Sequence, residues 1–205
     1  MVHFSTHELL AMVIGASFAA GLNVYATIAT LGLIAHTGAL QLPPNLHVLE
    51  NWWVIGVALA LFVIEFFADK IPAFDLIWNA LHTFIRVPIA ALLGYQATSQ
   101  LSPHAQLLTG LMAGGIALVS HGGKTAIRAA VTPSPEPLSN IGLSFGEDAV
   151  AIGLTWFATM HPYWAAGATA AMVVVAMVLI RWVLRALRSL FRGAARRVEN
   201  LAETI

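Results

Sequence analysis

The sequence predicts an all-α membrane protein with about six transmembrane helices in two inverted three-helix repeats. Hydrophobic residues make up 59% of its 205 residues and charged residues only 10%, whereas a typical soluble domain carries about 25% charged residues. Several apolar stretches also reach the ~20 residues needed to cross a bilayer. Finally, the two halves of the chain show the same order of glycine-interrupted and proline-bounded segments. We therefore expect one transmembrane domain over residues 1–205, with half one at about 8–98 and half two at about 104–181.

The first segment, residues 9–35, is long enough to span but is interrupted at Gly21-Leu22-Asn23. Glycine here favours either a local break or a close helix contact, with Asn23 bonded to a neighbouring helix. Residues 36–51 then form a loop without Lys or Arg, and the second segment covers 52–68. Its start at Trp52-Trp53 is typical of a membrane–water interface, and Asp69, Lys70 and Pro72 end it.

The third segment, residues 72–97, begins with a polar stripe. Asp75, Asn79, His82 and Arg86 recur at the spacing of one helix face. The first half is therefore either an amphipathic helix in the interface plane or part of a tilted span whose polar face lines a cavity. Pro88 is expected to kink or break this helix.

The second half contains a fourth segment at 106–131, a proline-rich extended linker at 132–137 and a fifth segment at 139–160. A sixth segment at 163–180 continues into a basic amphipathic tail at 182–205. The tail carries most of a stripe of arginines, which we expect to bind anionic membrane lipid: Arg181, Arg185, Arg188, Arg192, Arg196 and Arg197.

Loop charges predict the orientation. The Arg-rich tail favours a cytoplasmic C-terminus, and with six spans the N-terminus would lie on the same side. The loops at 36–51, 96–105 and 161–163 would face outward, and none contains Lys or Arg. We therefore expect a multi-pass protein of the bacterial inner (cytoplasmic) membrane with both termini in the cytoplasm.

An internal repeat supports two halves of three spans each. Phe66-Phe67-Ala68 followed by Pro72 matches Trp156-Phe157-Ala158 followed by Pro162, in the same register. Halves with an odd number of spans insert with opposite topology, and inverted repeats with broken helices are typical of many transporters.

Residues 120–148 concentrate charge between apolar segments. Lys124 and Arg128 share a helix face near the inner end of the fourth segment, and Glu147 and Asp148 lie at a similar depth in the fifth. Because a short linker makes these segments neighbours, we expect the cations to face the carboxylates. The cluster then either neutralises itself or forms a polar vestibule. Gly122-Gly123 would start a half-helix there, whose free N–H groups suit an anion.

Other site classes find little support. The chain has no cysteine, and GGKT at 122–125 lacks the first glycine of a phosphate-binding loop, because Leu118 stands there. No His-Glu-x-x-His pattern occurs among the eight histidines. We expect no metal, cofactor, catalytic residue or nucleic-acid partner, although His121 with Glu147 and Asp148 leaves acid–base work on a lipid open.

Four motifs, GLNVYATIATLGL, FFADKIPAFDLIWNALHTFIR, HGGKTAIRAAVTPSPEP and NIGLSFGEDA, resemble a family of small bacterial inner-membrane proteins catalogued as a domain of unknown function. The resemblance covers about residues 10–179. It implies a shared membrane fold and brings no activity, substrate or site residues.

From the residues themselves we expect a small transporter or channel, with an anionic solute as a candidate substrate. The alternatives are a lipid-handling protein, either a flippase or a lipid-modifying enzyme that contacts a head group, and a structural or assembly factor. Small residues at Gly15 and Ala19, and at Gly110 and Gly114, also suggest a homo-oligomer. The expected substrate-binding residues are Asn23, Glu65, Asp69, Lys70, Arg86, His121, Gly122, Gly123, Lys124, Arg128, Glu147 and Asp148.

Overall fold

The structure, a computed structural model, describes residues 4–131 and 137–202, so the predicted linker lies mostly outside the described residues. Within the helices it leaves undescribed the side chains of 72–76, 137–140, 190–191 and 193–202, among them Asp75, Arg196 and Arg197. The described ranges are helical and contain no strand. In order, the elements are α1 (Thr6–Leu22), α2 (Val24–His36), the 3-10 helix η1 (Pro44–Glu50), α3 (Trp52–Ala68), α4 (Pro72–Ala97), α5 (Pro103–Val131), α6 (Pro137–Met160) and α7 (Pro162–Ala202).

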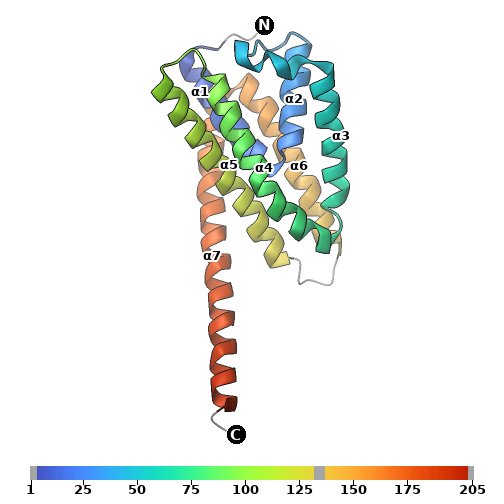
Figure 1. Cartoon of the computed structure of the whole chain (residues 1–205), viewed down its shortest axis with the longest axis vertical. Helices are drawn as coiled ribbons and strands as arrows, with labels where there is room; N and C mark the ends of the chain where they lie inside the picture. Colours follow the sequence, from blue (N-terminus) through green and yellow to red (C-terminus); the bar gives the residue numbers. More distant parts are fainter. Residues whose placement is uncertain (1–3, 132–136, 203–205) are drawn as a thin grey trace.

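The predicted first span is a hairpin of two short helices. Asn23 is extended, with φ −150° and ψ 103°, and its side chain caps α2 by accepting from the Ala26 N–H. α1 runs into the bundle and α2 returns to the end where α1 began (Figure 1). The start of α1 and the segment that follows α2 line one cavity of about 320 Å³ at that end. Phe4 and Leu9 contribute from the first segment, and Pro43 and His47 from the second. The expectation of one crossing over residues 9–35 is therefore wrong.

The remaining helices alternate in direction along the long axis of the bundle (Figure 1). α3 and α4 have the bounds that the sequence predicts for the second and third segments. α5 and α6 begin two or three residues before the predicted starts, each at a proline. Proline is favoured in the first helical turn, where its missing N–H would have no intrahelical partner.

α4 resolves the two interpretations of its polar stripe. The helix continues through Pro88 without a break and runs obliquely from one end of the bundle to the other (Figure 1). Asn79, His82 and Arg86 are each buried, at 3% exposure or less. These three polar residues therefore line the protein interior and do not lie at the membrane interface.

Length and composition identify fewer spans than six. Among the described residues, Ile77–Ala97 and Pro162–Ser189 are long and apolar enough to cross a membrane. A third candidate arises if η1 and α3, which meet at 65°, are counted as one bent span. The protein is thus a helical membrane protein, and the six-span count is not confirmed.

The inverted repeat is not confirmed either, because the first elements of the two halves differ. Half one begins with the α1–α2 hairpin, whereas α5 is one unbroken helix through Gly122-Gly123. The predicted half-helix at this glycine pair is therefore wrong. Both glycines serve packing against α7: a Cβ at Gly123 would lie 2.9 Å from the Ala176 Cβ, and one at Gly122 would lie 3.2 Å from Ile180.

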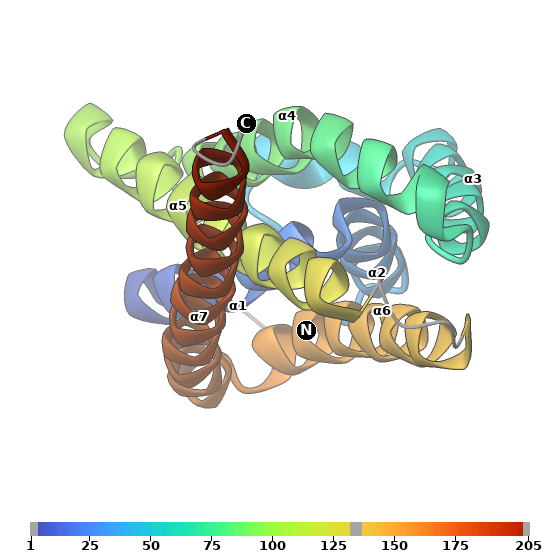
Figure 2. The same cartoon turned by 90° about the horizontal axis from the view of Figure 1, so that it is seen from below.

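The two ends of the chain lie at opposite ends of the bundle. α1 begins at one end, and α7 extends past the other end as a long projecting helix (Figure 1). Seen from below in Figure 2, the projecting part of α7 points toward the viewer, and α1 lies behind it. The prediction that both termini share one side of the membrane counts the hairpin as a crossing, and it stays a prediction.

Small residues bring the helices together within one chain. A Cβ at Gly21 would lie 2.4 Å from the Ala117 carbonyl oxygen, and one at Gly15 would lie 2.8 Å from the Ala158 Cβ. Gly110 and Gly114 pack in the same way against Ala91 of α4. These glycines therefore serve contacts inside the monomer, and their spacing does not by itself indicate an oligomer.

Candidate functional site

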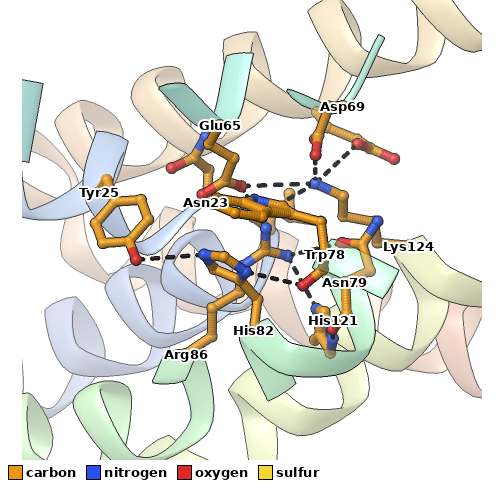
Figure 3. Close-up of polar contacts among 12 residues, drawn as sticks. Asn23, Tyr25, Glu65, Asp69, Trp78, Asn79, His82, Arg86, His121 and Lys124 are labelled. Carbon is orange, nitrogen blue, oxygen red and sulfur yellow. Dashed lines mark hydrogen bonds and ion pairs between the residues drawn. The ribbon is translucent and has the colours of Figure 1, made fainter. Parts of the chain in front are cut away.

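The hairpin tip meets a cluster of buried charged side chains, much of which Figure 3 shows in close-up. We call the group of seven ionisable residues around the tip the charge cluster. Each member exposes 5% or less of its surface, except Glu147, whose side chain is 10% exposed. The cluster consists of Glu65, Asp69, Arg86, Lys124, Arg128, Glu147 and Asp148.

Arg86 of α4 connects three helices. One of its terminal nitrogens, Nη2, pairs with the Glu65 carboxylate of α3, and the other, Nη1, lies 2.9 Å from His121 Nδ1 of α5. A guanidinium only donates hydrogen bonds, so His121 Nδ1 must accept. Its Nε2 lies 3.0 Å from the Asn79 carbonyl oxygen and therefore carries the proton. His121 is consequently a neutral ring in this arrangement.

Lys124 and Arg128, one turn apart on α5, share two carboxylates. Lys124 Nζ lies 2.7 Å from Asp69 Oδ2 and 3.3 Å from Glu147 Oε2. Arg128 Nη2 lies 3.2 Å and 2.5 Å from the same two oxygens. The predicted pairing of these cations with the fifth segment is confirmed for Glu147.

Asp148 has a different partner from the one that the sequence suggests. Its Oδ1 accepts a 2.9 Å hydrogen bond from Asn23 Nδ2, across 125 positions of sequence. Its Oδ2 is buried without a hydrogen-bond partner. Asn23 therefore does two things at the break: its oxygen caps α2, and its amide nitrogen holds α6.

The two helix ends at the tip meet charges of opposite sign. The last carbonyl groups of α1 lie near cations: Gly21 O is 3.4 Å from Arg86 Nη1, and Leu22 O is 3.4 Å from Lys124 Nζ. The first turn of α2 begins at Asn23, beside the Asp148 carboxylate. Both placements suit the helix dipole, which is negative at a C-terminus and positive at an N-terminus.

Nine of the twelve predicted site residues belong to the charge cluster or hydrogen-bond to it, and the other three do not. Lys70 Nζ donates to the Phe66 carbonyl at 2.6 Å and lies 3.0 Å from the centre of the Phe66 ring. It follows α3, outside that helix, and burial lowers the pKa of its ammonium, partly opposed by Asp148 and Asp69. Gly122 and Gly123 pack against α7, as described above.

Sequence reasoning missed several polar residues that complete the site. Tyr25 of α2 places its hydroxyl 3.3 Å from His82 Nε2, and Thr83 Oγ1 lies 2.8 Å from His121 Nε2. Ser120 donates to the Phe18 carbonyl of α1 at 2.7 Å. The polar stripe on α4 already signalled His82, but nothing near Tyr25 or Ser120 in the sequence shows that a hairpin would reach them.

An apolar cavity of about 280 Å³ ends at the charge cluster. Its walls include Phe18 of α1 and Met172 and Val175 of α7, and Lys124 and Glu147 lie on its lining. Among the described residues, no group of three or more His, Asp or Glu is arranged to hold a metal ion. The site thus offers buried ion pairs, polar donors and one apolar approach.

Comparisons with known proteins identify a family but no activity. Neither a curated protein nor a solved structure matches the chain. A family model described as a domain of unknown function, DUF4126, matches residues 10–182. This match contains every member of the charge cluster and about the first half of α7. The chain therefore belongs to the DUF4126 family of domains of unknown function.

Proposed function

We propose that this protein is a small transporter whose solute site lies at the tip of the α1–α2 hairpin. The observation that carries the proposal is that the broken helix ends within the charge cluster, in the interior of a membrane protein. Discontinuous helices whose ends face ions or charged substrates are how many transporters build their sites. A purely structural bundle does not need seven ionisable side chains at this position.

The energetic argument favours a function for these charges. Removing ions from water costs several kcal/mol each, and a buried ion pair is often no more stabilising than apolar residues of the same volume. Ionisable residues inside membrane proteins therefore mark substrate or ion pathways by default. Lys124 and Arg128 share the Asp69 and Glu147 oxygens, so an anion could replace a carboxylate without leaving a cation unpaired.

The proposed substrate is a small anion, such as phosphate or a carboxylate, bound between Lys124 and Arg128. In the arrangement described here, the two cations are occupied by Asp69 and Glu147, as in a closed, substrate-free state. Binding would exchange these internal partners for the solute, and each displaced carboxylate would take up a proton or turn to water, because a buried unpaired charge is costly. Release on the other side would restore them, so the ion pairs would reset the protein after each cycle.

Uptake into proteoliposomes tests the proposal. We expect radiolabelled phosphate or acetate to enter faster than into protein-free liposomes, and Lys124→Met to abolish the difference. Arg181→Met, on the exposed face of α7, is the matched control and should keep it. If wild-type protein moves neither anion under any imposed gradient of pH or voltage, the anion-transport proposal fails.

The apolar cavity favours lipid handling as a second candidate function. It places Lys124 and Glu147 at the end of a space bounded by Met172, Val175 and Leu179 of α7, so an acyl chain could lie in it with its head group near the ion pair. Fluorescent phosphatidylglycerol in proteoliposomes provides the test. Dithionite bleaches only the lipid in the outer leaflet, which is about half of the total in protein-free liposomes. Bleaching of more than this half would indicate lipid movement between the leaflets, and Val175→Trp should block it.

The exposed arginines of α7 fit the membrane placement that the loop charges predict. Arg181, Arg185 and Arg188 are exposed on the part of α7 that continues past the bundle. Such a stripe suits the anionic head groups of a cytoplasmic leaflet. The proposed location is the bacterial inner membrane, with this end of α7 in the cytoplasm.

A further inference from the structure

The charge cluster has more carboxylates than cations. Three cationic side chains, Arg86, Lys124 and Arg128, face four carboxyl groups: Glu65, Asp69, Glu147 and Asp148. His121 is neutral by its contacts with Arg86 and Asn79. His82 Nδ1 donates to the Trp78 carbonyl, and its Nε2 faces the Tyr25 hydroxyl, which can donate to it. A neutral His82 ring therefore satisfies both contacts. If every carboxyl group were ionised, the charge cluster itself would carry one more negative charge than positive charges.

Asp148 is the carboxyl group without a cationic partner among its hydrogen bonds. Glu65, Asp69 and Glu147 each lie within ion-pair distance of Arg86, Lys124 or Arg128, whereas Asp148 accepts only from the neutral Asn23 amide. Its Oδ2 has no hydrogen-bond partner, and the residue is only 5% exposed. Ser144, one turn earlier on α6, is also buried with an unpartnered hydroxyl.

Among the described residues, no cation lies within ion-pair distance of the Asp148 carboxylate. Lys124 of α5 attracts the Asp148 carboxylate electrostatically, whereas Glu65 and Asp69 at the end of α3 repel it. Glu147 precedes it on α6. Lys70 attracts Asp148 electrostatically, but its ammonium donates to the Phe66 carbonyl and lies over the Phe66 and Phe145 rings instead of pairing with the Asp148 carboxylate. An unpaired buried charge is costly in a membrane protein, and adding a proton removes the charge without moving a helix.

We propose that Asp148 is a proton-binding site that couples the hairpin to α6. A proton adds to the carboxylate at Oδ2, giving a neutral acid, and leaves again when the site opens to water. Hydrogen bonds to a charged acceptor are roughly twice as strong as neutral ones. Protonation therefore weakens the hold of Asp148 on Asn23, and deprotonation tightens it. The proton would thus control how firmly the hairpin tip is held.

This inference rests on the proposed transport function for what the proton drives, but the protonation itself is measurable without transport. Infrared difference spectra of the protein in nanodiscs, recorded between high and low pH, report buried carboxylic acids through their carbonyl band. We expect such a band in the wild type, its loss in Asp148→Asn, and its retention in Glu147→Gln. The unchanged chain provides a second measurement, because carboxyl-labelled ¹³C-aspartate should shift the band in a protein with only three aspartates.

Each outcome of this experiment has a definite meaning. A band that ¹³C-aspartate does not shift, or that persists in a folded Asp148→Asn protein, overturns the assignment. A wild type without the band also overturns the assignment if sodium stabilises the protein through Asp148. In that case sodium in place of choline, at constant ionic strength, raises the unfolding temperature of the wild type but not of Asp148→Asn, and the site binds sodium. A confirmed band in a protein that fails every uptake assay would overturn the transport proposal and leave the proton site standing.

Discussion

At the scale of single residues, the charge cluster combines side chains that the sequence scatters over more than 80 positions. Glu65 and Arg86 belong to neighbouring helices, and both are fully buried. Because each satisfies the other, removing either one leaves an uncompensated charge inside the protein. The cost of such a loss is about 3–5 kcal/mol for a buried pair.

Replacing Arg86 should therefore be far more damaging than replacing an exposed arginine. We expect Arg86→Met to lower the unfolding free energy by about 3–5 kcal/mol, and Arg86→Met with Glu65→Gln to regain much of that loss. Arg181→Met serves as the control and should change little. Thermal unfolding in detergent measures these variants and Glu65→Gln alone, and strict additivity of the two single changes would show that the pair does not interact.

What the sequence could predict at this scale depended on distance along the chain. Lys124, Arg128 and Glu147 were predicted to meet because one short linker joins their helices, and they do. The partner of Asp148 could not be predicted in this way, because Asn23 lies 125 positions away. Helical periodicity alone could place Arg86 on a polar face but could not show which helix that face would contact.

At the scale of elements, the α1–α2 hairpin distinguishes this fold from the predicted one. Glycine and asparagine at 21–23 do mark a break, as the sequence suggests. The direction of the chain after the break is set by tertiary contacts: the Asn23 side chain to Asp148, and the close approach of Gly21 to α5. Local sequence carries no signal for a reversal of this kind.

Exchanging the residues of the Asn23–Asp148 pair tests that contact. Asn23→Asp keeps an oxygen to cap α2 but sets a second carboxyl group against Asp148. We expect a marked loss of stability at high pH, where both groups are ionised. Adding Asp148→Asn restores one donor and one acceptor and should recover most of it. Unfolding temperatures of the two single variants and the double variant decide the matter. A double variant no more stable than Asn23→Asp would show that the side chains do not meet.

Close packing of the hairpin against α5 gives a second prediction at this scale. A Cβ at Gly21 would lie 2.4 Å from the Ala117 carbonyl oxygen, and backbone cannot yield cheaply. We expect Gly21→Ala to cost about 1–3 kcal/mol through overpacking. Gly115→Ala is the matched control: it faces open space in α5 and should be neutral or stabilising by up to about 1 kcal/mol. Equal unfolding temperatures for the two variants would contradict the packing described here.

At the scale of the whole molecule, the hairpin changes the number of crossings. Because α1 and α2 open to the same end, we predict that α3, α4, α5, α6 and α7 each cross the membrane. An odd number of crossings would place the chain ends on opposite sides. The loop charges remain consistent with this arrangement. Residues 36–51 and 98–102 contain no Lys or Arg, and the α3–α4 turn at the other end holds Lys70.

Cysteine labelling in intact cells tests this topology directly, because the chain contains no cysteine of its own. Thr6 and Gln41 are exposed and line the same cavity, at the end where the hairpin opens, and Ser189 is exposed on the second half of α7. If α7 ends in the cytoplasm, a membrane-impermeant maleimide should label Thr6→Cys and Gln41→Cys from outside, and Ser189→Cys only after lysis. Gln41→Cys is the internal control, since both topologies place it outside. Thr6→Cys protected in intact cells while Gln41→Cys reacts would mean that α1 and α2 cross as a single span, because only a crossing can separate these two sites.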